Sequence, residues 1–165
     1  MKCSHCNEEI GELSLFFGSK TPYHYLVLDE AARQNRCEIN KDLCVIDQNQ
    51  YFIRGDLEIP ILGTGDIFIW SVWSSISECN FTRVNDLWNS TARQNESAYF
   101  GWFSTQLPIY PNTLNLKCEV QTREVGVCPK ILLESTDHPL AIEQRKRITM
   151  ERVHEINHLI GHETK

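Results

Sequence analysis

Residues 154–158, HEINH, have the residue types and the spacing of a zinc hydrolase motif. On a helix, His154 and His158 lie one turn apart and can share one zinc ion, while Glu155 can activate a zinc-bound water. A zinc-dependent hydrolase with these three residues in its catalytic site is therefore the alternative hypothesis for the function.

The helix that would carry this motif favours a different interpretation. Its apolar residues recur at spacings of three and four, so both histidines and Glu155 fall on the opposite, polar face. The apolar stripe consists of Met150, Val153, Ile156 and Ile160. A catalytic zinc needs a third protein ligand, and Thr164 stands where the metzincin pattern would place a histidine. We favour a polar helix surface over a catalytic site.

Four cysteines form the second candidate metal site. Cys3 and Cys6 are separated by two residues, the spacing with which a tight turn presents two thiolates to one zinc ion. A closed structural site needs four ligands, and Cys37 and Cys44 are the best candidates for the other two. The alternative is that Cys44 is a small core residue and that Cys3 and Cys6 are free thiols. The sequence thus permits one structural zinc, and it indicates no other cofactor.

Aromatic residues accompany Arg54 along the predicted strands and form the remaining candidate binding site. Trp, Tyr and Arg are the residue types that contribute most to protein interfaces. The binding candidates are Arg54, Trp70, Trp73 and Trp102, with Tyr99 close to them in the pattern. The favoured alternative is that these large rings fill a core on both sides of a sheet.

The composition limits the class of protein. With 165 residues, of which 41% are apolar, the chain suits one compact domain. Its 16 basic and 22 acidic residues give a net charge of -6, which disfavours nucleic acid as a partner. No apolar stretch approaches the roughly 20 residues that span a membrane, and seven cysteines, an odd number, suit a reducing cytosol. We expect a cytoplasmic protein with a protein partner.

Residues 50–75 are the centre of the predicted fold. Alternating apolar and polar residues over 57–61 predict a strand with one solvated face, whereas residues 66–75 are apolar on both faces and should be covered on both. Gly63 and Gly65 supply the backbone freedom of a hairpin loop between the two strands. A helix over residues 77–89, with Ser77 as its N-cap, is expected to cover the second strand.

The other predicted elements are short. Strands are expected over 12–17, 42–47, 99–103, 114–121 and 130–134, and helices over 29–35, 139–145 and 149–158, with a polar loop at 89–97. Asp137 or His138 should cap the helix that starts at Pro139. This pattern predicts a single α+β domain, with a mainly antiparallel sheet, helices packed on it and an N-terminal cysteine knuckle. Its parts would be the knuckle (1–10), the α+β body (11–160) and a tail (161–165).

Four blocks of sequence together resemble one family. The blocks are FIRGDLEIP, FIWSVWSSISECNF, FGWF with LPIYPNTLNLK, and ESTDHPLAIEQRKRITMERV. They are similar to the bacterial domain of unknown function family 2199, and the resemblance runs from Cys3 to about Ile156. It implies no assigned activity. The chain departs from the family pattern at Asn7 and Ile10, where Gly and His are typical, and at Cys128, where Arg is typical. We expect a non-enzymatic bacterial protein-binding or accessory module.

Overall fold

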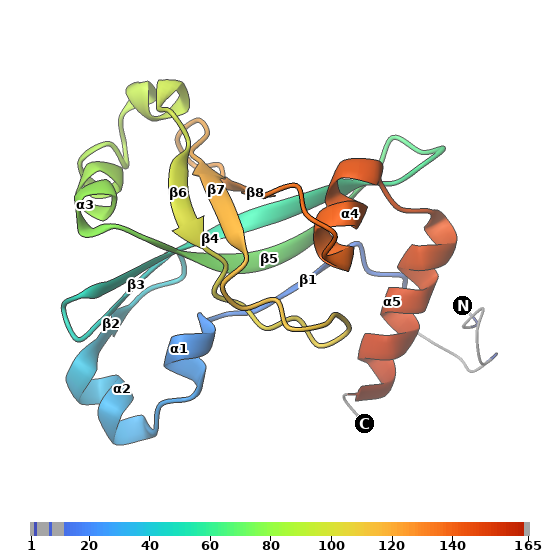
Figure 1. Cartoon of the computed structure of the whole chain (residues 1–165), viewed down its shortest axis with the longest axis horizontal. Helices are drawn as coiled ribbons and strands as arrows, with labels where there is room; N and C mark the ends of the chain where they lie inside the picture. Colours follow the sequence, from blue (N-terminus) through green and yellow to red (C-terminus); the bar gives the residue numbers. More distant parts are fainter. Residues whose placement is uncertain (1, 3–6, 8–11, 164–165) are drawn as a thin grey trace.

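One eight-stranded sheet carries the helices of the described chain (Figure 1). The computed structural model describes Lys2, Asn7 and residues 12–163. The strands are β1 (Phe16–Gly18), β2 (Cys37–Ile39), β3 (Leu43–Ile46), β4 (Gln50–Pro60), β5 (Ile67–Ile76), β6 (Tyr99–Trp102), β7 (Lys117–Gln121) and β8 (Lys130–Leu133). The helices are α1 (Tyr23–Leu26), α2 (Glu30–Arg36), α3 (Glu78–Asp86), α4 (Pro139–Lys146) and α5 (Met150–Glu163), with the 3₁₀ helix η1 (Thr91–Asn95).

The long hairpin of β4 and β5 is the centre of the sheet, as the sequence predicts. The two strands pair antiparallel from Tyr51 opposite Ile76 to Pro60 opposite Ile67. Along β4, Leu57 and its alternate neighbours are fully buried, while the residues between them are half-buried. The remaining pairs are mostly antiparallel, with parallel contacts between β1 and β5 and between β4 and β8. The prediction of a single α+β domain is confirmed.

The sheet coils until its last strand returns to β5. Its order is β1-β5-β4-β8-β7-β6, and the β2–β3 pair is attached to β4. An isolated antiparallel bridge joins Ser74 of β5 to Phe103, which directly follows β6. The Ser104 N–H also donates to the Trp73 carbonyl at 2.8 Å. Figure 1 shows β6 and β7 standing across β4 and β5. The result is a nearly closed, barrel-like sheet.

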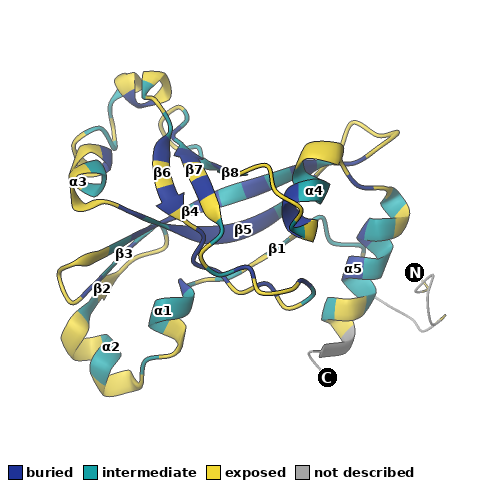
Figure 2. Cartoon of the chain, viewed as in Figure 1, coloured by how far each residue is buried: buried dark blue, intermediate teal, exposed yellow. Residues whose placement is uncertain are grey.

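Two hydrophobic cores lie on opposite faces of β4 and β5. The larger core fills the coiled sheet and is completed by α4 and α5, which contribute residues such as Leu140, Val153 and Ile156. The smaller core lies beneath α1 and the β2–β3 pair, and contains Cys44, Ile46, Phe52 and Trp73. Buried residues accordingly follow β4, β5, β6 and β7 in Figure 2. One face of β5 is buried along the strand, whereas on the other face Trp73 is buried but Ile67 is 44% exposed, so the expected cover is complete on one face only.

Helix α3, which was expected to cover β5, lies elsewhere on the sheet. Helix α3 begins after Ser77, whose Oγ accepts a hydrogen bond from the Asn80 N–H, so the predicted cap is confirmed. However, α3 packs against β4, where the rings of Tyr51 and Phe81 lie 4.9 Å apart. Helix α3 thus contributes Val84 to the edge of the larger core but is not the expected lid over β5. The coiled sheet with α4 and α5 covers one face of β5, and α1 with the β2–β3 pair covers the other around Trp73.

Several local elements also differ from the prediction. Helix α1, strand β2 and the 3₁₀ helix η1 were not expected, and η1 lies inside the segment predicted to be a polar loop. Residues 114–116 precede β7 as a turn, in which Asn115 has a φ of 65°. Apart from Lys2 and Asn7, the knuckle lies outside the described residues, as does the end of the tail. No helix in the described part of the chain is long and apolar enough to cross a membrane.

Candidate functional site

The tryptophans predicted to contribute to binding lie in different environments. Trp70 is 1% exposed in the larger core, and Trp73 is 0% exposed in the smaller core. Because they are three residues apart on β5, they point to opposite faces of the strand. Trp102 is 43% exposed on β6. The structure does not bring the three rings into one groove, and Trp70 and Trp73 fill two separate cores.

Arg54 lies outside the larger core and holds the tip of the β2–β3 hairpin. Its Nε donates to the Lys41 carbonyl at 2.8 Å, its Nη2 to the Asp42 carboxylate at 3.1 Å and its Nη1 to the Ser71 hydroxyl at 3.2 Å. The hydrogen bonds to Lys41 and Asp42 attach the hairpin tip to β4. Arg54 therefore positions the residues around it, and Lys41 in particular.

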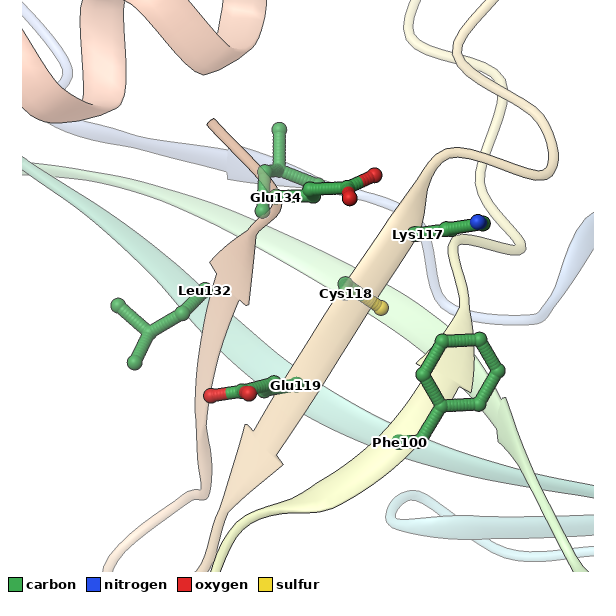
Figure 3. A pocket seen from close by; sticks show the side chains of 7 residues that line it. Phe100, Lys117, Cys118, Glu119, Leu132 and Glu134 are labelled. Atoms are coloured by element: carbon green, nitrogen blue, oxygen red, sulfur yellow. The ribbon is translucent and has the colours of Figure 1, made fainter. Parts of the chain in front are cut away.

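Trp102 belongs to an exposed face made by three neighbouring strands. We define the β6–β7–β8 face as Phe100, Trp102, Lys117, Glu119, Leu132 and Glu134. Phe100 pairs with Glu119, which pairs with Leu132, and Trp102 pairs with Lys117, so these residues share one side of the sheet. A hollow of about 290 Å³ lies here, and Figure 3 shows side chains from β6, β7 and β8 around it.

Aromatic side chains and charges alternate on the β6–β7–β8 face. The rings of Phe100 and Trp102 meet edge to face with centroids 5.2 Å apart, and Lys117 lies 6.0 Å from the Trp102 ring. Glu119 and Glu134 add two carboxylates to this single cation. The face therefore combines a rigid aromatic pair with a small excess of negative charge.

The HEINH motif lies on α5 and has no third ligand among the described residues. His154 and His158 are half-buried, and the Nδ1 of His154 is buried without a hydrogen-bond partner. The Glu155 carboxylate forms an ion pair with Arg152 at 3.2 Å. Within the described chain, no three His, Cys, Asp or Glu residues cluster closely enough to hold a metal ion. The Glu155 carboxylate that would activate water thus already has a cationic partner.

Asn157, between the two histidines, has a clear structural role. Its side chain accepts a hydrogen bond from the Ser14 N–H and donates one to the Ser14 carbonyl, both at 2.9 Å. It also donates to the Val153 carbonyl at 2.8 Å. The motif helix therefore holds the segment that leads into β1.

A partly buried polar network joins α4 and α5. Glu143 accepts hydrogen bonds from the Tyr110 hydroxyl at 2.8 Å and from the Arg152 Nε at 2.9 Å. Burial, and then the charge of Glu143, raise the pKa of Tyr110. The Glu143 carboxylate thus links Tyr110 to Arg152.

The candidate zinc ligands are only partly within the described structure. Cys3 and Cys6 lie outside the described residues. Cys37 is half-buried on β2 and Cys44 is fully buried on β3, where they lie diagonally across the strand pair. Burial, and then the proximity of Cys37, raise the pKa of Cys44 to about 12. Without a bound metal, Cys44 is thus a small buried thiol in the smaller core.

A cavity of about 280 Å³ lies where the segment from Trp88 to Arg93 and the β7–β8 loop meet the tip of the β2–β3 hairpin. We call it the Arg93 cavity, and its charged or aromatic wall consists of Lys41, Asp42, Arg54, Trp88 and Arg93. Cys128, where the family pattern has Arg, also lines it, and burial raises the pKa of its thiol to about 12. Sequence reasoning missed Arg93 because it lies in a polar segment with no recognised motif.

The fold defines a single-domain α+β protein. Its two candidate binding sites are the aromatic β6–β7–β8 face and the basic Arg93 cavity. A model of the family DUF2199, described as an uncharacterized protein conserved in bacteria, matches residues 2–148. The chain belongs to this family, which confirms the resemblance found in its sequence. No curated protein and no solved structure matches it.

Proposed function

We propose that this protein is a non-enzymatic, protein-binding module of the bacterial cytoplasm, and that the β6–β7–β8 face is its binding surface. The observation that carries the proposal is the exposure of two adjacent aromatic side chains, Phe100 at 52% and Trp102 at 43%. Single exposed apolar residues are ordinary, but a paired aromatic patch beside a hollow is typical of an interaction site.

The strand that carries these rings is held rigidly. The Trp102 N–H donates to the Ser75 hydroxyl at 3.1 Å, and β6 pairs with β7 along its whole length. A rigid surface loses little conformational entropy when a partner binds. The aromatic pair is therefore presented in a form suited to binding.

The charges on the face favour a basic partner. Glu119 and Glu134 flank the hollow with one cation, Lys117, between them, and the whole chain carries a net charge of -6. The occupant we propose is a segment of another protein that places an apolar side chain against Phe100 and Trp102 and a Lys or Arg beside the glutamates.

Selection from a random peptide library on the immobilised protein tests this proposal. We expect enriched peptides to combine a basic residue with an aromatic or aliphatic one. Phe100→Ala and Trp102→Ala should each weaken their binding about tenfold or more, because such aromatic anchors dominate interface energies. Affinities can be measured by calorimetry with one synthetic peptide.

Phe16→Ala is the matched control, since Phe16 is 54% exposed on β1, away from this face. It should leave the peptide affinity unchanged. Peptides that bind both aromatic variants as tightly as the wild type, or a consensus rich in acidic residues, would contradict the proposal.

A structural zinc held by Cys3, Cys6, Cys37 and Cys44 is a separate proposal. It is supported by the sequence spacing of the first pair and by the proximity of the second pair on the β2–β3 hairpin.

The hydrolase hypothesis stays a prediction from the HEINH motif. Native mass spectrometry separates the two: Cys6→Ser should remove one bound zinc and His158→Ala should not. The opposite pattern would favour the hydrolase, and a zinc-free wild type would contradict both.

A further inference from the structure

Arg93 is a buried cation without a carboxylate partner. The residue is 4% exposed, and its guanidinium packs on the Trp88 ring at 4.9 Å. The one hydrogen bond of its guanidinium to a described residue runs from Nη1 to the Trp88 carbonyl at 2.8 Å, and its Nε is buried without a partner. None of the ion pairs found among described residues includes Arg93. Arginine stays protonated in proteins, so a nearby anion would stabilise it.

The backbone around Arg93 is fixed independently of any ligand. The Ser90 Oγ accepts a hydrogen bond from the Ala92 N–H and so caps η1. The Arg93 carbonyl accepts one from the Thr122 hydroxyl at 2.6 Å, and Thr122 is itself 4% exposed. The guanidinium is therefore held in place before anything binds.

The carboxylate nearest to Arg93 along the chain has other partners. Glu96, three residues later, forms an ion pair with Arg83 and accepts a hydrogen bond from the Tyr99 hydroxyl at 2.8 Å. Those contacts direct Glu96 away from Arg93. The interaction with the Trp88 ring offsets part of the cost of burying the charge, but it leaves the Nε side of the guanidinium unpaired.

The wall of the Arg93 cavity adds further positive charge. Lys41 and Arg54 line it with Arg93, while Asp42 is the one carboxylate among its lining residues and is paired with Arg54. Among the lining side chains, three cations and one carboxylate leave two net positive charges. Asp56, which interacts with Cys128 of the wall, is itself paired with Arg123. This local excess contrasts with the net charge of -6 of the whole chain.

We propose that the Arg93 cavity binds the phosphate group of a small phosphorylated ligand. A phosphate monoester carries about 1.5 to 2 negative charges at pH 7 and balances two unpaired cations, whereas a carboxylate balances one. The Nη2 group of Arg93 makes no hydrogen bond to a described residue and can donate to a phosphate oxygen. At roughly 30 Å³ per water, a volume of about 280 Å³ also holds a short organic group. This site is separate from the β6–β7–β8 face.

Titration of the nitrogen-labelled full chain, followed by nuclear magnetic resonance, tests the site. The probes are inorganic phosphate and phosphoserine, with acetate as the singly charged comparison at constant ionic strength. We expect saturable shifts of the amides of Asn89, Gly126 and Val127, which line the cavity. Both phosphates should produce these shifts and raise the melting temperature, and acetate should bind at least about tenfold more weakly. Tighter binding of phosphoserine would identify a phosphate ester as the preferred ligand, and equal binding would identify the free ion.

Two variants and a control make the test specific. Arg93→Met keeps most of the side-chain length without the charge, and Lys41→Ala removes an exposed cation without touching either core. Each should weaken phosphate binding about tenfold or more. Lys20→Ala removes an exposed cation from the neighbouring cavity beside Arg54 and should change nothing. Equal binding of acetate and phosphate, shifts confined to other amides, or unchanged binding in both variants would overturn the proposal.

Discussion

Gly101 lies so close to Ser74 that there is no room for a side chain between them. An added Cβ would stand 2.1 Å from the Ser74 Oγ and 2.3 Å from the Ser75 carbonyl oxygen. The same Ser74 hydroxyl lies 3.2 Å from the Cys118 sulfur on β7. This contact between β5 and β6 closes the coiled sheet around the larger core.

Gly101→Ala should lower the free energy of unfolding by roughly 1–3 kcal/mol, because the strands must separate to admit the methyl group. Urea denaturation followed by tryptophan fluorescence measures this change. Gly65→Ala is the control, since an added Cβ there meets nothing within 4 Å. A Gly101→Ala protein as stable as the wild type would show that β6 can move away from β5 without a loss of stability, which would contradict the prediction.

His138 begins α4 and joins it to an earlier turn. Its Nδ1 accepts a hydrogen bond from the Leu140 N–H at 3.1 Å, so its Nε2 carries the proton and lies 3.2 Å from the Pro111 carbonyl and 3.1 Å from that of Asn112. His138→Ala should lower the free energy of unfolding by about 1–2 kcal/mol. Asp137→Ala, at the neighbouring candidate cap, should have little effect in the same denaturation assay. A larger loss from Asp137→Ala would contradict this assignment.

In protein freed of metal by a chelator, the buried Cys44 thiol should make the stability depend on pH. Its pKa is raised from 9.0 to about 12, so above pH 9 the folded protein retains a proton that the unfolded chain has released. This contribution is fully present below pH 9 and is lost as the pH rises toward 12, by up to about 1.4 kcal/mol per pH unit. Urea denaturation over this alkaline range should show a shallower slope for Cys44→Val.

Cys79→Ala, at an exposed thiol, is the matched control for that experiment and should keep the slope of the wild type. The remaining slope of Cys44→Val comes from other buried groups such as Cys118, whose pKa burial raises to about 11. Identical slopes for Cys44→Val and the wild type would refute the assignment.

Asn157→Ala should release the segment that leads into β1. The change leaves the Ser14 N–H and carbonyl without their partners on α5, which should cost about 1–2 kcal/mol of stability. Hydrogen exchange at the Ser14 amide is the direct measurement and should become faster. Glu151→Ala, at an exposed position of the same helix, is the control. Unchanged protection of Ser14 would count against this role.

The central hairpin could be predicted because its information is local. Alternation over 57–61 and two-sided apolarity over 66–75 are properties of neighbouring residues, and Gly63 has the positive φ of 75° that its loop requires. What covers β5 depends on distant segments. Apolar residues on both faces of β5 indicate that other elements must pack on it. They do not indicate that β6 packs against β5 at Gly101.

The short elements were not predicted because they too depend on contacts with distant segments. Helix α1 has one turn, and its first residue is fixed by a hydrogen bond from the Tyr23 N–H to the Ser104 carbonyl at 2.8 Å. A helix this short has too little intrinsic stability to leave a clear sequence pattern.

The candidate binding surface was only half predictable. Residues 99–103, YFGWF, predict an aromatic strand, but both of its faces carry large rings. Which rings face water follows from the register, which directs Tyr99 inward and Phe100 and Trp102 outward. The burial of Arg93 had no local signal at all, because it depends on Trp88 and on the β7–β8 loop.

Helix α5 lies beyond the family match, which ends at residue 148, yet it completes the larger core. Val153 and Ile156 are both 0% exposed, and Asn157 holds Ser14 at the other end of the described chain. A fragment cut at the family boundary would present an open apolar surface to water and release its first strand. The cooperative folding unit is therefore longer than the segment by which the family is recognised, and expression of the isolated match should yield an aggregation-prone protein.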